Sequence, residues 1–250
     1  MQAQDEYATT HAQEMQLRGA CLEFVAFKDG LDAIGKIQQF ASPLERVARK
    51  LACLTLKRGE EWTALHPQDF CRLALPFSDP EGGREKTMVP ATINPRLVIS
   101  GSRNFSPASW ARDIDPTEVM DWSDGLVDAN DGNDMGQMPR VTQIGNLPLY
   151  VAVEGKNRVA LFKRYRLTMK AMVLKSPLPS PQDLQLVRLR PFGVHALKYA
   201  GETRVLPFPA FTVPLLEAYG VQNGEAPMDV TAVARFCAAR KRICSKQMWA

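Results

Sequence analysis

The stretch Tyr150–Tyr165, YVAVEGKNRVALFKRY, joins an apolar strand to a helix rich in lysine and arginine, with Gly155 between them. Two interpretations are open. One is a tight turn followed by a solvated helix face. The other is an anion cradle, because the unpaired N–H groups and the dipole of a helix N-terminus attract negative charge. In the second interpretation, glycine lets the backbone approach a phosphate closely, while Lys156 and Arg158 supply cationic donors.

The bulk composition is that of an ordinary globular chain. It has 250 residues, of which 45% are hydrophobic and 23% charged, and a net charge of +4. This mildly basic balance is compatible with nucleic-acid contact but does not establish it. No apolar run reaches the ~18 residues that span a bilayer, and the N-terminus lacks a signal-peptide layout. We therefore expect a cytoplasmic protein without membrane contact, and its five scattered cysteines indicate reduced thiols.

The periodicity of apolar residues predicts an α/β or α+β fold. Strands are expected at 96–99, 140–144, 149–153, 167–174, 184–189 and 194–197. Helices are expected from Pro43, over 66–75, near 116–122, after Gly155, over 214–219 and over 229–249. Residues 21–27 fit either a strand or the start of a helix. The chain divides into a mainly helical region (1–90), a core (91–175) and a C-terminal extension (176–250) that ends in a basic helix.

An acidic segment precedes the strand at 140–144. It carries eight Asp or Glu residues between Asp113 and Asp134, without Lys or Arg. EF-hand spacing is not met. Three alternatives remain: a solvated loop, a metal site, and an acidic surface that faces the basic helix of a partner or of the same chain. If Mg²⁺ acts beside a bound phosphate, the preferred carboxylates are Glu154, then Asp121, then Asp124, because Glu154 adjoins the cradle.

The order of strand, glycine, arginine and helix resembles the ParB/sulfiredoxin family. Val153, Gly155 and Arg158 hold the apolar, glycine and arginine positions of its motif. The resemblance implies a ParB/sulfiredoxin-like core that binds nucleotide or DNA phosphates, with ATP or CTP and Mg²⁺ as cofactors and metal-dependent nuclease or NTPase activity. The wider group includes plasmid fertility-inhibition proteins. Lys156 and Asn157 replace the cysteine and histidine of sulfiredoxins, which excludes that chemistry.

These readings assign roles to particular residues. Glu154 is the expected catalytic group, positioning metal or water, and no dedicated metal ligands are predicted. Phosphate is expected at Gly155, Lys156, Asn157 and Arg158. Contacts to nucleic acid or to a partner are expected from Lys163, Arg166, Arg240, Lys241 and Arg242. The alternative function is a non-enzymatic interaction protein that regulates a partner such as conjugation or secretion machinery through its acidic loop and basic C-terminal helix.

Overall fold

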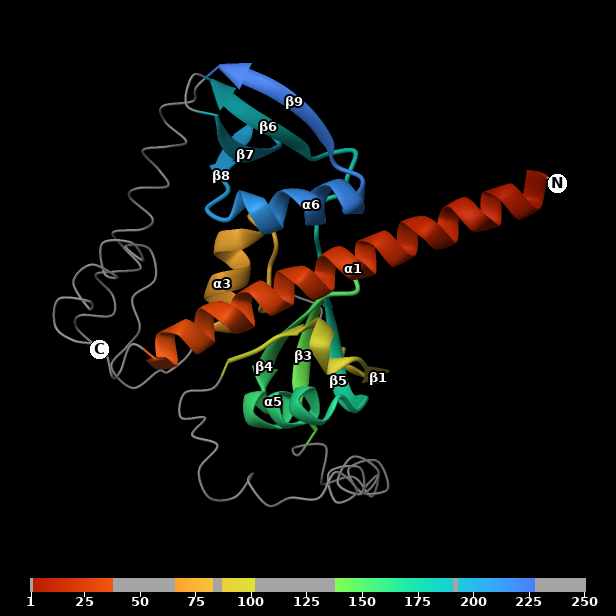
Figure 1. Cartoon of the computed structure of the whole chain (residues 1–250), viewed down its shortest axis with the longest axis vertical. Coiled ribbons are helices and arrows are strands. Elements are labelled where there is room, and N and C mark those ends of the chain that lie inside the picture. Colours follow the sequence, from red (N-terminus) through yellow and green to blue (C-terminus); the bar gives the residue numbers. More distant parts are fainter. Residues whose placement is uncertain (1, 38–65, 83–86, 102–137, 191–192, 228–250) are drawn as a thin grey trace, which may run out of the picture.

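A computed structural model describes residues 2–37, 66–82, 87–101, 138–190 and 193–227. It contains helices together with two sheets of mixed strand direction, which confirms the predicted α/β or α+β class. In Figure 1 the helix α1 (Gln2–Ile37) crosses the middle of the molecule, with one sheet on each side of it. The helices predicted from Pro43, near 116–122 and over 229–249 lie outside the described residues.

The first sheet has five strands in the order β1-β5-β3-β4-β2. They are β1 (Val89–Ile93), β2 (Val98–Ile99), β3 (Arg140–Ile144), β4 (Tyr150–Glu154) and β5 (Met169–Ser176). The outermost strands would be about 19 Å apart in a flat sheet. Yet β1 and β2 are joined only by Asn94 and the 3-10 turn η2 (Pro95–Leu97), a turn that rises only about 2 Å per residue. The sheet must therefore curl.

Three of the predicted strands in this sheet are confirmed as β3, β4 and β5. The expected strand at 96–99 is partly wrong, because its first two residues belong to η2. The strand β1 was not predicted. Its first four residues are exposed, so it lacks the apolar alternation that identifies a half-buried strand from sequence.

Helix α5 (Lys156–Tyr165) packs on one face of this sheet. Val159, Leu161 and Phe162 are fully or almost fully buried, and each buried side chain of this size contributes about 1.5–3 kcal/mol. They form a cluster with strand residues including Val141 and Ala152. This packing fixes the helix that carries four of the predicted site residues: Lys156, Asn157, Arg158 and Lys163.

The second sheet has four strands in the order β8-β7-β6-β9. They are β6 (Gln185–Arg190), β7 (Val194–Tyr199), β8 (Glu202–Val205) and β9 (Gln222–Pro227). The predicted strands at 184–189 and 194–197 form the antiparallel pair β6 and β7. Helix α6 (Pro209–Tyr219) begins five residues earlier than predicted, since it includes Pro214 within the helix.

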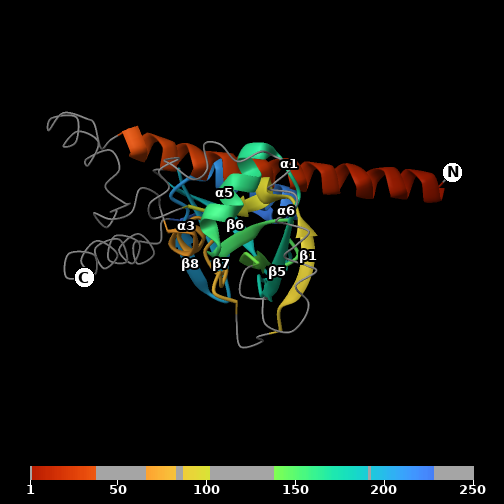
Figure 2. The same cartoon turned by 90° about the horizontal axis from the view of Figure 1, so that it is seen from below.

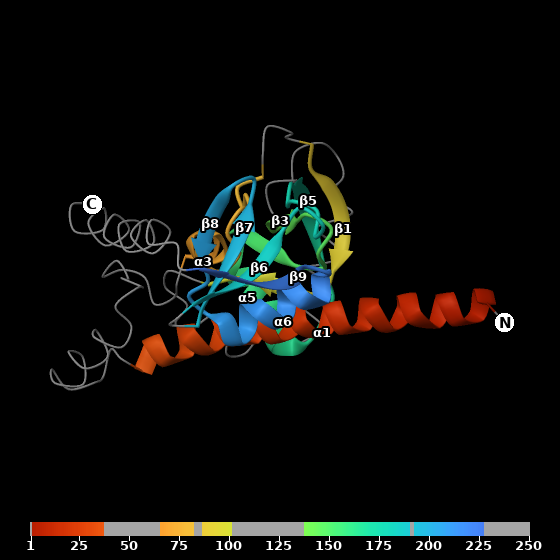
Figure 3. The same cartoon turned by 90° about the horizontal axis from the view of Figure 1, so that it is seen from above.

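The N-terminal region is one continuous helix through residues 21–27, so the strand alternative was wrong. Cys21, Phe24 and Val25 are buried at helical spacing, which orients one stripe of α1 toward the core. Figures 2 and 3 show the N-terminal half of α1 extending beyond the rest of the molecule. The predicted helix at 66–75 is α3 (Pro67–Ala74), with His66 as its N-cap.

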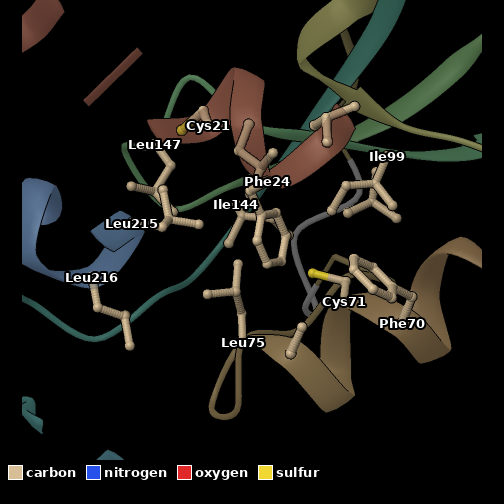
Figure 4. Packing of buried hydrophobic residues seen from close by; sticks show 14 of the residues in the cluster. Cys21, Phe24, Phe70, Cys71, Leu75, Ile99, Ile144, Leu147, Leu215 and Leu216 are labelled. Carbon is tan, nitrogen blue, oxygen red and sulfur yellow. The ribbon is translucent and has the colours of Figure 1, made fainter. Parts of the chain in front are cut away.

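One core lies between α1, α3, α6 and both sheets. Figure 4 shows Phe24, Phe70, Ile144 and Leu215 converging from four separate elements. All four side chains are 0–1% exposed, and the rings of Phe24 and Phe70 are 5.4 Å apart. The core therefore includes residues from all three regions into which the sequence was divided.

Candidate functional site

The junction between β4 and α5 has the predicted order of strand, glycine and helix. Gly155 is the N-cap of α5, with φ 69° and ψ 26°, and it has no side chain to cap the helix. Within α5 the N–H of Val159 donates to the carbonyl of Gly155 at 3.1 Å. The N–H groups of the first turn thus receive no capping bond from the N-cap side chain, which leaves donors suited to an anion.

The local structure explains why position 155 is a glycine, and part of this explanation was not visible in the sequence. The positive φ of Gly155 favours glycine. In addition, a Cβ at this position would lie 2.9 Å from the Cα of Pro139. The close approach of Pro139 therefore explains the glycine without a ligand, and Gly155 alone is not evidence for phosphate.

The ends of two parallel strands place further groups at this edge of the sheet. Strands β2 and β4 are parallel, with Ile99 opposite Val151, so their carboxyl ends lie at the same edge. Ser100, which follows β2, is 4% exposed there. The antiparallel strand β3 starts at the same edge, and its Arg140 pairs in register with Glu154.

Glu154, the predicted catalytic carboxylate, is exposed at the end of β4. Its Oε2 lies 3.4 Å from Nη1 of Arg140. Because both side chains are more than one-third exposed, such a pair contributes at most about 1 kcal/mol. Within the residues described, no group of three or more His, Cys, Asp or Glu side chains could hold a metal ion. Any Mg²⁺ at Glu154 would therefore have to be completed by ligand phosphate and water.

Lys156 and Arg158 flank the first turn of α5, since residues two apart lie on nearly opposite sides of a helix. Both side chains are half-buried. Burial lowers the pKa of Lys156, and Asp69 of α3 partly offsets this effect. Arg158 has no ion pair or hydrogen bond within the part of the chain that the structure describes. Asn157 occupies the same turn through its backbone.

The start of α3 lies within electrostatic reach of this turn. Burial lowers the pKa of His66, and the nearby charge of Lys156 lowers it further, while Asp69 acts in the opposite direction. The start of α3 is therefore a neighbour of the junction, which the sequence did not predict. His66 and Asp69 lie 90 residues or so before Gly155, and no local pattern connects them to it.

Lys163, for which we predicted a contact to nucleic acid or to a partner, is largely buried in an ion pair. Its Nζ donates to both carboxylate oxygens of Asp29 on α1, at 2.8 and 3.0 Å. The side chain is only 13% exposed. Burial lowers the pKa of Lys163, and Asp29 partly offsets this effect. The charge of Lys163 is therefore paired with Asp29 within the fold.

Arg166 is exposed, but it lies at the opposite end of α5 from Gly155. Ten helical residues separate the ends by about 15 Å, so Arg166 cannot assist the same phosphate as Arg158. The remaining predicted residues lie outside the described ranges; they are Arg240, Lys241, Arg242, Asp121 and Asp124.

A buried ionic network that the sequence did not predict lies beside the junction. Lys28 of α1 is fully buried, and its Nζ donates to Asp32 and to the carbonyl of Ser100. Burial lowers the pKa of Lys28 to about 8 although Asp32 opposes the shift. The i,i+4 spacing of Lys28 and Asp32 was visible, but lysine is almost always exposed, so the spacing alone indicates a surface pair.

Comparisons of this chain with protein-family models, curated proteins and solved structures gave no match. Among the described helices, none combines the length and apolar character needed to cross a bilayer.

Proposed function

We propose that this protein binds a phosphate group, carried by a nucleotide or by DNA, at the junction between β4 and α5. The observation that carries the proposal is the first turn of α5, whose N-cap offers no capping side chain and which has Lys156 and Arg158 on its two sides. Backbone donors and the helix dipole would bind the phosphate oxygens. Arg158 would add a planar fork of donors matched to two of those oxygens.

The proposal includes kinship with the ParB/sulfiredoxin family, and it is supported by the motif residues Val153, Gly155 and Arg158. We place Glu154 beside the bound phosphate, where it would hold Mg²⁺ or water in a metal-dependent nuclease or NTPase reaction. An exposed pair with Arg140 costs little to break, so it does not prevent a metal from approaching. The acidic loop and the basic C-terminal helix, on which the alternative interaction role depends, lie outside the described residues.

A binding experiment tests the site directly. Wild type would be titrated with ATP, CTP and short duplex DNA, with and without Mg²⁺, at low salt. We expect Arg158→Ala to weaken binding by about 10- to 150-fold, since a charge-assisted bond contributes roughly 1.5–3 kcal/mol. Glu154→Gln should keep Mg²⁺-independent binding and lose the Mg²⁺-dependent part together with any turnover.

Arg204→Ala is the matched control. It removes the same charge from β8 in the other sheet, where Arg204 is exposed and pairs with Glu202. Binding that falls equally in Arg204→Ala and Arg158→Ala would reflect net charge and would remove the junction from the proposal. Failure of wild type to bind ATP, CTP or DNA in every condition would overturn the proposal.

A further inference from the structure

Two consecutive residues of α1 contact two different elements of the proposed phosphate site. Lys28 donates to the carbonyl of Ser100, at the carboxyl end of β2. Asp29 accepts from Lys163 of α5 through both carboxylate oxygens. One turn of α1 is therefore bonded both to the sheet edge and to the helix on which the phosphate would lie.

The Lys28 and Asp29 contacts differ in how safely they can be tested by mutation. Lys28 is fully buried with Asp32, and removal of one partner of a buried ion pair endangers the fold itself. Asp29 is 43% exposed, whereas its partner Lys163 is 13% exposed. Asp29 can therefore be replaced with a smaller risk to folding, while its loss leaves the Lys163 ammonium without its carboxylate.

We propose that Asp29 is a positioning residue, which holds α5 through Lys163 so that the first turn of the helix meets the phosphate. The inference rests on the proposed function. It assigns Lys163 an indirect role, since the ammonium orients α5 and does not contact the ligand. It also makes α1 part of the phosphate site, although α1 contributes no side chain to the ligand.

The direction in which phosphate affinity changes when Asp29 is replaced distinguishes a positioning role from a purely electrostatic one. Removal of a carboxylate makes the protein more positive, which by long-range charge alone strengthens phosphate binding. If Lys163 were itself a phosphate contact, its release from Asp29 would strengthen binding as well. Positioning predicts the opposite sign, because an unanchored α5 no longer presents its donors in one geometry.

The test compares Asp29→Ala with Glu202→Ala in titrations with ATP and with short duplex DNA. Glu202 lies on β8 and pairs with Arg204 at 2.8 Å, so its replacement removes the same charge far from the junction. We expect Asp29→Ala to bind about tenfold more weakly than wild type, and Glu202→Ala to bind as tightly as wild type or slightly more tightly. The double variant Asp29→Lys, Lys163→Asp restores an ion pair of opposite polarity and should recover most of the lost affinity.

Hydrogen exchange of the α5 amides, residues 156–165, provides a readout that needs no ligand. Exchange there should be faster in Asp29→Ala than in Glu202→Ala and should return toward wild type in the double variant. Unchanged exchange, or binding by Asp29→Ala that equals or exceeds wild type, would overturn the role of Asp29. If wild type binds neither ATP, CTP nor DNA, the proposed function fails, while the exchange result still decides whether Asp29 positions α5.

Discussion

Gly155 and Lys163 show how single residues depend on partners that are distant in sequence. The position of Gly155 between a strand and a helix was predictable from local pattern, and its positive φ agrees with that pattern. Its contact with Pro139 was not predictable. Lys163 was counted among the surface cations, but Asp29 binds it from 134 residues away. Residue type indicates which interactions a side chain can make, and packing decides which partner it has.

Replacement of Gly155 by alanine should destabilise the protein more than an equivalent change elsewhere. Gly201 is the matched control, because it also has a positive φ, 78°, but a Cβ there would meet nothing within 4 Å. We expect Gly201→Ala to cost about 1 kcal/mol, the conformational penalty alone. Gly155→Ala should cost about 2–4 kcal/mol, since Pro139 must also move. Urea unfolding measures both values, and equal losses would contradict the packing explanation.

At the scale of elements, the basic residues of α5 lie on different sides and at different ends of the helix. Lys156 and Lys163 are seven residues apart and share the side that faces α3 and α1, where Asp69 and Asp29 lie. Arg158 lies on the other side of the helix. The sequence predicted the helix itself correctly, because its apolar spacing and its glycine are local signals. It could not show which side faces an acidic neighbour.

Helix α1 provides a pH-dependent prediction through Lys28. Burial lowers its pKa from about 10.5 to about 8 in the folded protein. Between these values the unfolded chain binds more protons than the folded chain, so the contribution of Lys28 to the free energy of unfolding rises with pH from about 8 to 10.5. Below pH 8 the lysine is charged in both states, and its contribution is constant.

The variant Lys28→Met should remove this contribution. Unfolding by urea at several pH values would give the free energy of unfolding for wild type and variant. We expect the difference, wild type minus variant, to increase from pH 8 to pH 10.5 and to stay flat below pH 8. A difference that is flat or falls over the upper range would show that Lys28 does not titrate with a lowered pKa in the folded state.

At the scale of the whole molecule, both sheets depend on one core. Phe27 of α1 stacks on Phe211 of α6 with ring centroids 3.9 Å apart, and Phe24 packs against Phe70 of α3. These contacts join the second sheet to the first through α1, α3 and α6. The proposed phosphate site is therefore not carried by a separate folding unit.

Truncation of Phe24 should accordingly weaken the whole structure. We expect Phe24→Ala to lower the free energy of unfolding by about 3–5 kcal/mol. Hydrogen exchange should become faster in β3 and in β6 together, because Ile144 of β3 and Leu186 of β6 both belong to the core cluster that contains Phe24. Faster exchange in one sheet alone would indicate that the two sheets unfold independently. Phe24→Leu, which keeps most of the volume, should show a much smaller loss.

The sequence by itself determined the elements with local signals. These are the strands β3 to β7, the helices α3 and α5, and the position of Gly155 between strand and helix, because apolar spacing and glycine act over a few residues. Only the tertiary structure decided that residues 21–27 continue one helix and that β1 joins the sheet. It also decided that Lys28 is buried and that Lys163 forms an ion pair with Asp29. Each of these depends on the free energy of contacts between residues far apart in the chain, which local periodicity does not contain.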